Sequence, residues 1–325
     1  MSRISLSLIL LSFLFGCDSY HDNSNRLIIF HAGSLSMPMK AIADSFKIKY
    51  PEVTIRLEAA GSVECARKIT ELNRNADIMA SADYKIIDDL LIPNHADWNV
   101  LFSGNELSLV YTNKSRYANE INADNWFEIL QLPNVHHGRS DPNADPCGYR
   151  TLLTLQLAEE FYGQPGLTQK ISRKDTRFIR PKEVDLLALL ETGTIDYIFL
   201  YRSVAVQHGL EYLILPKEIN LGNPKLTNEY ANASVTIRGS SPLDTMQIVG
   251  EPMVYGITIP KNADNPLLAK KFLEFFMHPE YGLKIIERMG MPALQPPVIK
   301  NKELMDEELL ESIQRNWSLL TPEDS

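Results

Sequence analysis

Residues 27–39 read LIIFHAGSLSMPM, an apolar run followed by a Gly-Ser turn and the start of a segment with helical apolar spacing. The run predicts a buried strand, and the spacing of Met37, Ile42 and Phe46 predicts a helix. The first N–H groups of a helix lack intrahelical partners and lie at its positive end. This turn could therefore hold an anion through backbone amides and the Ser34 hydroxyl. Ordinary helix capping by Ser34 is the alternative.

The same strand-turn-helix pattern follows twice more along the chain. Residues 53–57 (VTIRL) alternate as a strand and lead through Gly61 and Ser62 into a helical segment, and residues 76–80 (ADIMA) precede a third junction. Three such units in succession predict a parallel sheet with crossover helices. Sheets of this kind bind ligands beyond the carboxyl ends of their strands. We expect Ser34 and Ser62 to lie together at that edge.

Length and composition restrict the class of protein. The 325 residues predict two domains or one large α/β unit, and a composition of 44% hydrophobic and 22% charged residues excludes disordered and fibrous chains. The net charge of −9 and the absence of Lys and Arg clusters argue against a nucleic-acid surface. An acidic protein that binds an anion would have to do so locally, through backbone amides and helix ends.

The N-terminus has the pattern of an export signal. Arg3 precedes an uncharged apolar stretch, residues 4–15, which has the length of a signal-peptide core and is short for a membrane span. We predict a signal peptide over residues 1–16. Residues 14–17 (LFGC) resemble a bacterial lipobox, which predicts Cys17 as the lipidated first residue of a tether over residues 17–26. An ordinary signal peptide and an uncleaved anchor are the alternatives.

Two further cysteines, Cys65 and Cys147, remain if Cys17 is lipidated. Export favours a disulfide between such a pair. We place the two residues on opposite walls of a cleft, where a bridge would lock the cleft shut, and therefore expect both to be unbridged.

The middle of the chain predicts a second lobe reached and left by two crossing strands. Residues 107–111 (LSLVY) are the first crossing, and residues 253–259 (MVYGITI) return to the first lobe. The expected fold is α/β, with a mixed sheet flanked by helices in each lobe and two hinge crossings. Lobe 1 is expected to comprise residues 27–108 plus 256–325, and lobe 2 residues 109–255. Pro292, Pro296 and Pro297 are expected to end the compact fold.

Three residues of the second lobe stand at element ends where a ligand could bind. Asp145 precedes Pro146, which suits a first helical position, so Asp145 is predicted to cap a helix beginning near Gly148. Glu183 lies in the first turn of a predicted helix, where a carboxylate is favoured by the helix dipole alone. Tyr201 ends a buried strand and is either a core ring or a donor to a ligand. Each residue thus also has a purely structural interpretation.

Taken together, the export signal and six short motifs resemble the tungstate/molybdate-binding proteins of the WtpA type. The motifs are residues 32–35 (AGSL), 60–62 (AGS), 76–78 (ADI), 145–150 (DPCGYR), 201–203 (YRS) and 255–260 (YGITIP). This family comprises the oxyanion-binding components of ABC importers. The resemblance covers residues 27–297 and implies a two-lobed periplasmic-binding-protein fold, type II-like. It also implies no enzyme activity and no cofactor, with tungstate or molybdate as the ligand.

The resemblance also implies roles for individual residues. The oxyanion-binding positions are Ser34, Ser62, the Cys147 backbone amide and Tyr201, and the carboxylates that reach the metal atom are Asp145 and Glu183. The segment before Glu183 is shorter than many relatives carry, so Asp185 is a competing assignment. Two carboxylates would repel a dianion. A hexavalent molybdenum or tungsten centre is a hard Lewis acid that accepts further oxygen ligands, whereas the sulfur of sulfate does not.

We therefore expect an exported, monomeric substrate-binding protein, lipid-anchored on the extracytoplasmic face of the membrane. It would capture a small inorganic oxyanion and deliver it to an ABC transporter permease, with no nucleic-acid partner. Sulfate is the nearest alternative ligand, and ferric ion would require a cluster of tyrosines and histidine that the strand ends do not show. An exported serine hydrolase using Ser34 or Ser62 with His31 lacks a nucleophile-elbow sequence. The sensor lobe of a regulator would need a signalling segment for which the chain has no room.

Overall fold

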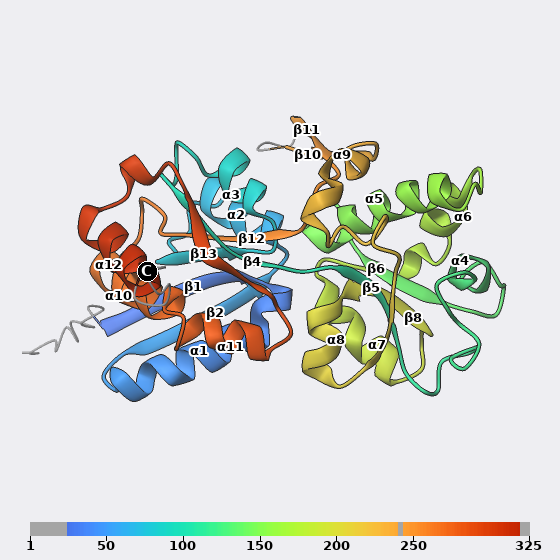
Figure 1. Cartoon of the computed structure of the whole chain (residues 1–325), viewed down its shortest axis with the longest axis horizontal. Coiled ribbons are helices and arrows are strands. Elements are labelled where there is room, and N and C mark those ends of the chain that lie inside the picture. The colour runs from blue at the N-terminus through green and yellow to red at the C-terminus, as the bar shows by residue number, and fades with distance from the viewer. Residues whose placement is uncertain (1–24, 240–242, 319–325) are drawn as a thin grey trace, which may run out of the picture.

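The structure is a computed structural model that describes residues 25–239 and 243–318. The predicted signal peptide, Cys17 and most of the tether lie outside the described residues. Two lobes lie side by side along the longest axis of the molecule and are joined by extended segments (Figure 1). Among the described residues, no helix has the length and apolar character needed to cross a membrane.

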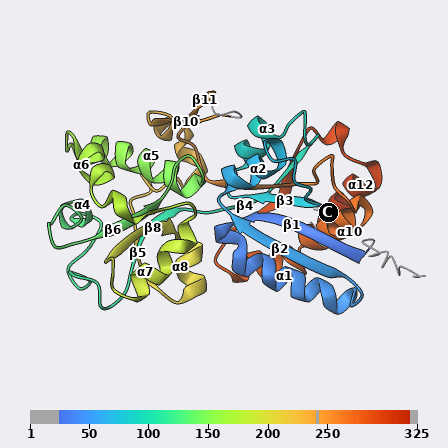
Figure 2. The same ribbon diagram turned by 180° about the vertical axis from the view of Figure 1, so that it is seen from behind.

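Lobe 1 is built on a six-stranded mixed sheet of order β13-β4-β12-β3-β1-β2. β1 pairs in parallel with β2 and β3, and the other neighbours are antiparallel. β1 is buried along most of its length because helices cover both faces, α2 and α3 on one and α1 and α11 on the other (Figures 1 and 2). The strands are β1 (Arg26–Ala32), β2 (Thr54–Ala60), β3 (Ile78–Ser81), β4 (Asn99–Gly104), β12 (Val254–Thr258) and β13 (Ala293–Lys300). The helices are α1 (Ser36–Lys49), α2 (Ser62–Thr70), α3 (Tyr84–Leu90), α10 (Pro266–Met277), α11 (Gly282–Arg288) and α12 (Glu307–Ser318).

Lobe 2 has a five-stranded mixed sheet of order β7-β6-β8-β5-β9, with a separate two-stranded hairpin, β10-β11. In the sheet, β6 is parallel to β7 and β8, whereas β5 is antiparallel to β8 and β9. The strands are β5 (Leu107–Tyr111), β6 (His137–Ser140), β7 (Ile179–Arg180), β8 (Tyr197–Tyr201), β9 (Glu211–Ile214), β10 (Ser234–Arg238) and β11 (Thr245–Val249). The helices are α4 (Trp126–Ile129), α5 (Pro146–Phe161), α6 (Leu167–Arg173), α7 (Leu187–Glu191), α8 (Arg202–His208) and α9 (Thr227–Tyr230).

Five 3₁₀ turns connect these elements in the described part of the chain, and two of them matter for the site. They are η2 (Gly33–Leu35), η3 (Thr176–Phe178), η4 (Glu183–Leu186), η5 (Pro224–Leu226) and η6 (Lys302–Leu304). η2 joins β1 to α1, and η4 runs directly into α7. The expected helix around Glu183 therefore begins as a 3₁₀ turn and becomes α-helical only at Leu187.

The chain crosses between the two lobes at two short segments. β4 ends at Gly104 in the first sheet and β5 begins at Leu107 in the second, so the first crossing is residues 105–106. The return lies between β11 and β12, at residues 250–253. Both crossings precede the lobe bounds expected from the sequence, which were residues 108/109 and 255/256. The prediction of two α/β lobes with mixed, helix-flanked sheets is confirmed.

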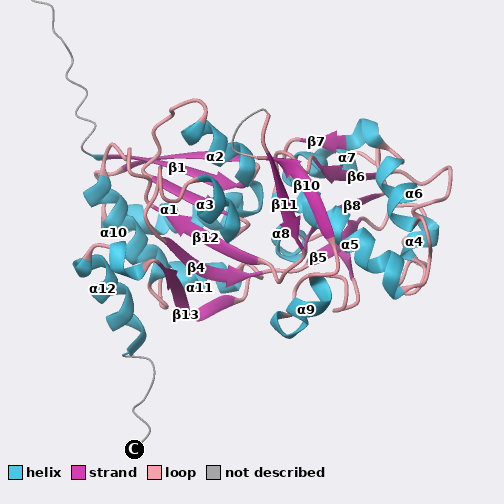
Figure 3. Cartoon of the chain, turned by 90° about the horizontal axis from the view of Figure 1, so that it is seen from above, coloured by secondary structure: helices cyan, strands magenta, loops and turns pink. Residues whose placement is uncertain are grey.

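The prediction that the prolines end the compact fold is wrong. β13 contains Pro296 and Pro297 and pairs with β4 at the edge of the lobe 1 sheet, with a register shift between Ala293 and Val298 (Figure 3). A proline cannot donate to a strand ladder, and edge strands and irregularities tolerate it. The chain then forms α12, whose buried apolar side chains include Leu309 and Ile313. These prolines shape an edge strand and do not stop the fold.

Candidate functional site

The Gly33–Leu35 turn holds Ser34 buried between the end of β1 and the start of α1. Neither η2 nor α1 has a side-chain capping hydrogen bond, so Ser34 does not serve as a cap. The Tyr255 hydroxyl, on β12, instead donates to Ser34 Oγ at 3.0 Å. Because that oxygen accepts, the Ser34 proton remains available for another acceptor.

The second turn brings Ser62 to the same edge of the sheet. β1 and β2 are parallel with Ala32 opposite Ala60, so the turns that follow them lie side by side. Gly61 is the N-cap residue of α2, and Ser62 is its first helical residue. The buried Ser62 Oγ accepts the Ala82 N–H at 2.9 Å. As with Ser34, the serine proton is left free to donate.

Asp145 is the N-cap of α5 and is almost fully buried. Its Oδ1 accepts the Cys147 N–H at 3.2 Å, which confirms the predicted capping role, although the helix begins at Pro146 and not near Gly148. Its Oδ2 accepts the Glu183 N–H at 2.9 Å. One carboxylate therefore fixes the starts of both α5 and η4, and the Cys147 amide expected at the oxyanion already has a partner.

Glu183 is completely buried, and among the described residues neither of its carboxylate oxygens makes a hydrogen bond of normal geometry. The carboxylate lies against the first turn of lobe 1, because a methyl group placed on Gly33 would be 2.9 Å from Glu183 Oε2. A methyl group on Gly61 would likewise be 3.0 Å from Asp145 Cβ. The segments of lobe 2 that carry Asp145 and Glu183 thus pack closely against the two glycine-serine turns of lobe 1.

The competing residue Asp185 has a different environment. Its side chain is 39% exposed and forms an ion pair with Lys182 at 3.3 Å. Asp185 therefore lies toward solvent, while Glu183, two residues earlier in the same turn, faces Gly33.

Burial makes the two site carboxyls hard to ionise together. Burial raises the pKa of Glu183 well above its usual range, and the neighbouring Asp145 charge raises it further. Burial also raises the pKa of Asp145, against the lowering effect of the hydrogen bonds that it accepts. Burial and mutual repulsion therefore favour a protonated carboxyl in this pair unless a positive centre binds beside it.

A buried ion pair completes the floor of the site. Tyr201, at the end of β8, accepts a hydrogen bond from Arg150 Nη1 at 3.0 Å. Arg150 also donates to Ala82 O at 2.7 Å and lies 3.3 Å from Asp83 Oδ2. Tyr149 donates to the same Asp83 oxygen at 2.6 Å. Lobe 2 thus contacts the two residues that follow β3 in lobe 1 through side chains that are all buried.

Contacts at the rim show that the lobes are closed on each other. Arg67 on α2 donates to Asn143 O at 2.6 Å and to Arg238 O at 2.7 Å, both in lobe 2. Arg238 in turn pairs with Glu71, the residue that follows α2, at 2.9 Å. The hairpin β10-β11, which carries Arg238, lies over the junction of the two lobes (Figure 1).

Sequence reasoning missed three residues that support these groups: Tyr255, Arg150 and Asn105. Two of them lie within the quoted motifs, but no local pattern marks their contacts. Asn105 belongs to the first crossing and donates from Nδ2 to the Tyr255 hydroxyl at 3.0 Å and to Ser203 Oγ at 2.7 Å. Its position between β4 and β5 is the only sequence signal that could have pointed to it.

The cysteines and His31 have structural partners. Cys65 and Cys147 are both free and buried, as expected, with their thiols directed at His31 O and Phe199 O. His31 Nδ1 bonds to Ala32 O at 2.8 Å, and burial lowers the pKa of His31 to about 4. Among the described residues no hydrogen bond joins the His31 ring to Ser34 or Ser62, so the hydrolase arrangement is not assembled.

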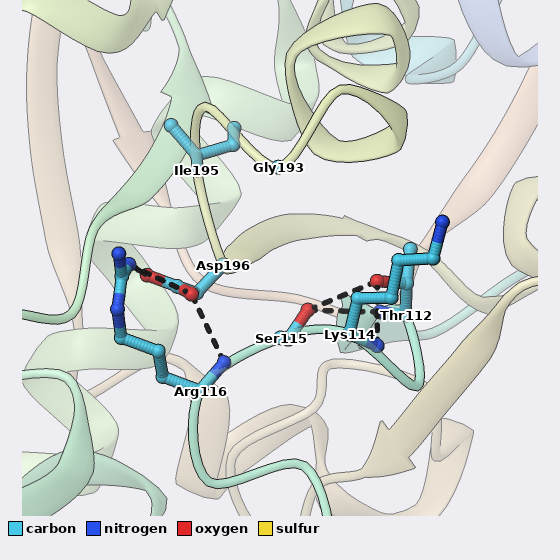
Figure 4. Close-up of a pocket in the computed structure, with 7 residues that line it drawn as sticks. All are labelled: Thr112, Lys114, Ser115, Arg116, Gly193, Ile195 and Asp196. Atoms are coloured by element: carbon cyan, nitrogen blue, oxygen red, sulfur yellow. Dashed lines mark hydrogen bonds and ion pairs between the residues drawn. The ribbon is translucent and has the colours of Figure 1, made fainter.

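A polar pocket of about 130 Å³ lies at the opposite end of lobe 2, where β5 ends and β8 begins. Its lining is Thr112, Lys114, Ser115, Arg116, Gly193, Ile195 and Asp196 (Figure 4). Arg116 pairs with Asp196 at 2.9 Å across it. None of the residues predicted for the site lines this pocket.

Two α/β lobes that close serine turns of one lobe over carboxylates of the other define a two-lobed binding protein. Comparison with known sequences agrees with this class. The chain belongs to the family of bacterial extracellular solute-binding proteins, whose profile matches residues 27–292.

Individual relatives cover nearly the same length. A solute-binding protein of Petrotoga mobilis is 46% identical over 299 residues, which is 91% of this chain and 93% of that protein. A Pyrococcus abyssi protein named molybdate/tungstate-binding protein WtpA is 43% identical over 301 residues, with 84% and 86% covered. The resemblance predicted from the motifs is therefore confirmed. The solved periplasmic molybdate-binding protein of Azotobacter vinelandii shares the fold at 16% identity, with a TM-score of 0.61 over 83% of this chain and 100% of that one.

Proposed function

We propose that the protein is the extracytoplasmic substrate-binding component of an ABC importer and that it captures tungstate or molybdate between its lobes. The observation that supports this most directly is the Glu183 carboxylate, which is fully buried beside Asp145 and makes no hydrogen bond of normal geometry with the described residues. The names of relatives that share most of the chain favour the same ligands.

A buried carboxylate without a partner is costly unless a positive centre is bound to it. A site made only to hold sulfate would present donors and would not place two acids at its centre. A hexavalent metal reverses the electrostatics, because the carboxylates then act as ligands to a hard Lewis acid. Asp145 and Glu183 would bind the metal atom of the oxyanion and so discriminate against sulfate.

The remaining groups would hold the oxo oxygens. Ser34 and Ser62 each have a free proton at the edge of lobe 1, and Tyr201 adds a third hydroxyl from lobe 2. The Cys147 amide lies beside Asp145 and would share its proton between that carboxylate and the ligand. Capture would therefore need both lobes, which is what closure around a hinge provides.

The test is titration calorimetry of Glu183→Gln with tungstate, molybdate and sulfate. Glutamine keeps the volume of the side chain but is a poor ligand for a hexavalent metal, so we expect tungstate affinity to fall by at least about 100-fold, or ~2.7 kcal/mol. Asp185→Asn is the matched control, because it removes an exposed carboxylate from the same turn, and it should bind normally. Normal tungstate binding by Glu183→Gln, or tight sulfate binding by the natural protein, would refute the proposal.

Anchoring and assembly belong to the same proposal. Cys17 would carry a lipid that tethers a monomer to the extracytoplasmic face of the membrane, near the permease that receives the oxyanion. Support comes from residues 14–17 and from membership in an extracellular solute-binding family. Mass spectrometry of the mature N-terminus tests the lipid, and light scattering of the purified protein tests the monomer.

A further inference from the structure

The three hydroxyl groups of the site share one property: each oxygen already accepts a hydrogen bond from a fixed donor of the protein. Ser34 Oγ accepts from the Tyr255 hydroxyl, Ser62 Oγ from the Ala82 amide and the Tyr201 oxygen from Arg150. All of these side chains are buried, so water does not compete for the same oxygens. A hydroxyl carries one proton, and its direction follows from what its oxygen accepts.

The direction at Ser34 is set by a chain of three hydrogen bonds that begins in the hinge. Asn105 Oδ1 accepts the Glu106 N–H at 3.0 Å, which fixes which end of the amide is the donor. Asn105 Nδ2 then gives one proton to Ser203 Oγ and one to the Tyr255 oxygen. The Tyr255 hydroxyl in turn donates a hydrogen bond to Ser34 Oγ. Burial raises the pKa of Tyr255, so the phenol keeps this proton.

The hydroxyl oxygens of Ser62 and Tyr201 also accept hydrogen bonds, in both cases from groups that cannot themselves accept one. A backbone N–H and an arginine are donors only. Ala82 therefore leaves the Ser62 proton pointing away from its own amide, and Arg150 does the same at Tyr201. Contacts with Ala82 O and Asp83 fix the orientation of the Arg150 side chain, so its guanidinium stays directed at Tyr201.

We propose that Tyr255, held by Asn105, is a positioning residue that directs the Ser34 proton toward the bound oxyanion. This inference rests on the proposed function, because it concerns how the captured oxyanion is recognised. Three such protons would match the oxo oxygens of a tetraoxo anion.

The test is a double-mutant cycle on tungstate affinity. Ser34→Ala should weaken binding by about 10- to 100-fold, because a hydrogen bond to a charged ligand is lost. Tyr255→Phe should weaken binding by about 5- to 20-fold, since the Ser34 proton is no longer directed. If Tyr255 acts through Ser34, Tyr255→Phe has less than about a threefold effect in the Ser34→Ala background. Additive losses would overturn the proposal and assign Tyr255 a merely structural role.

The matched control is Tyr197→Phe, which removes a buried hydroxyl that donates to Arg116 O at the far end of lobe 2. It should leave tungstate affinity unchanged. Thermal unfolding of each variant without tungstate reports whether it is folded.

Failure of the natural protein to bind tungstate would refute the proposed function, whereas normal binding with an additive cycle would refute only this inference.

Discussion

Replacing Gly61 by alanine should prevent the lobes from closing while leaving each lobe intact. The backbone at Gly61 has φ −61° and ψ 144°, which alanine adopts without strain. The added methyl carbon would be 2.2 Å from Ala144 O and 2.7 Å from Ala144 C, which belong to lobe 2. Atoms of this kind prefer separations of roughly 3.5 Å, so the two walls would have to move apart by about 1 Å.

The cost of that movement follows from the contacts that it breaks. Glu64 N donates to Ala144 O at 3.2 Å across the same junction, and losing this hydrogen bond costs about 1 kcal/mol. Overpacking of a tight contact costs about 1–3 kcal/mol more. The sum of about 2–4 kcal/mol corresponds to a tungstate affinity roughly 30- to 1,000-fold lower.

Titration calorimetry with tungstate measures this loss, and thermal unfolding without tungstate checks the fold. We expect an unfolding midpoint within about 4 °C of the natural protein, because the clash exists only where the lobes meet. Gly104→Ala is the control, since its methyl group would meet Met253 O at an ordinary 3.5 Å. If Gly61→Ala binds tungstate within threefold of the natural protein, closure does not bring Gly61 and Ala144 together and the reasoning fails.

Two further predictions concern the rim and the response to pH. Arg67→Ala removes the hydrogen bonds to Asn143 O and Arg238 O, so tungstate should be released about 10- to 100-fold faster in stopped-flow displacement. Lys68→Ala, which removes an ion pair with Glu64 inside lobe 1, should release tungstate at the natural rate, and equal rates for all three proteins would contradict the rim's role. The pKa of His31 is lowered from 6.5 to about 4, so the unfolded chain binds a proton that the folded protein excludes, and folding stability should fall as pH drops from 6.5 towards 4. His31→Asn should reduce this fall by up to about 1.4 kcal/mol per pH unit in ligand-free denaturation, and an unchanged slope would show that His31 is not its cause.

Much of the fold could be predicted because short apolar runs and small-residue turns alternate at the start of the chain. β1 and β3 are such runs, and the turns at Gly33 and Gly61 mark where helices begin. β4 gives a weaker signal, since its apolar centre is only residues 100–102. The sequence pattern is misleading at the end of the chain, because prolines usually mark the ends of helices and strands, whereas an edge strand accommodates them. Only pairing with β4, a long-range contact, shows which case applies.

The candidate site was predictable where residues stand at element ends, as Ser34, Asp145 and Glu183 do. Helix-end chemistry is local and leaves a trace in the sequence. The supporting residues lack such a trace, because their partners are distant: Tyr255 and Ser34 are 221 positions apart, and Asn105 and Tyr255 are 150 apart. A hydrogen bond of this kind depends on tertiary packing, and the periodicity of the sequence does not predict it.

The pairing of Asp145 with Glu183 has a consequence for the timing of transport. Arg67, Arg150 and Tyr149 attract the lobes to each other whether or not an anion lies between them. Glu183 opposes this attraction, because closure strips water from a carboxylate beside another acid. Under the proposed function, the metal centre of the bound oxyanion would remove that penalty. Glu183 would then disfavour closure without a ligand, so that the closed form would mark a loaded protein.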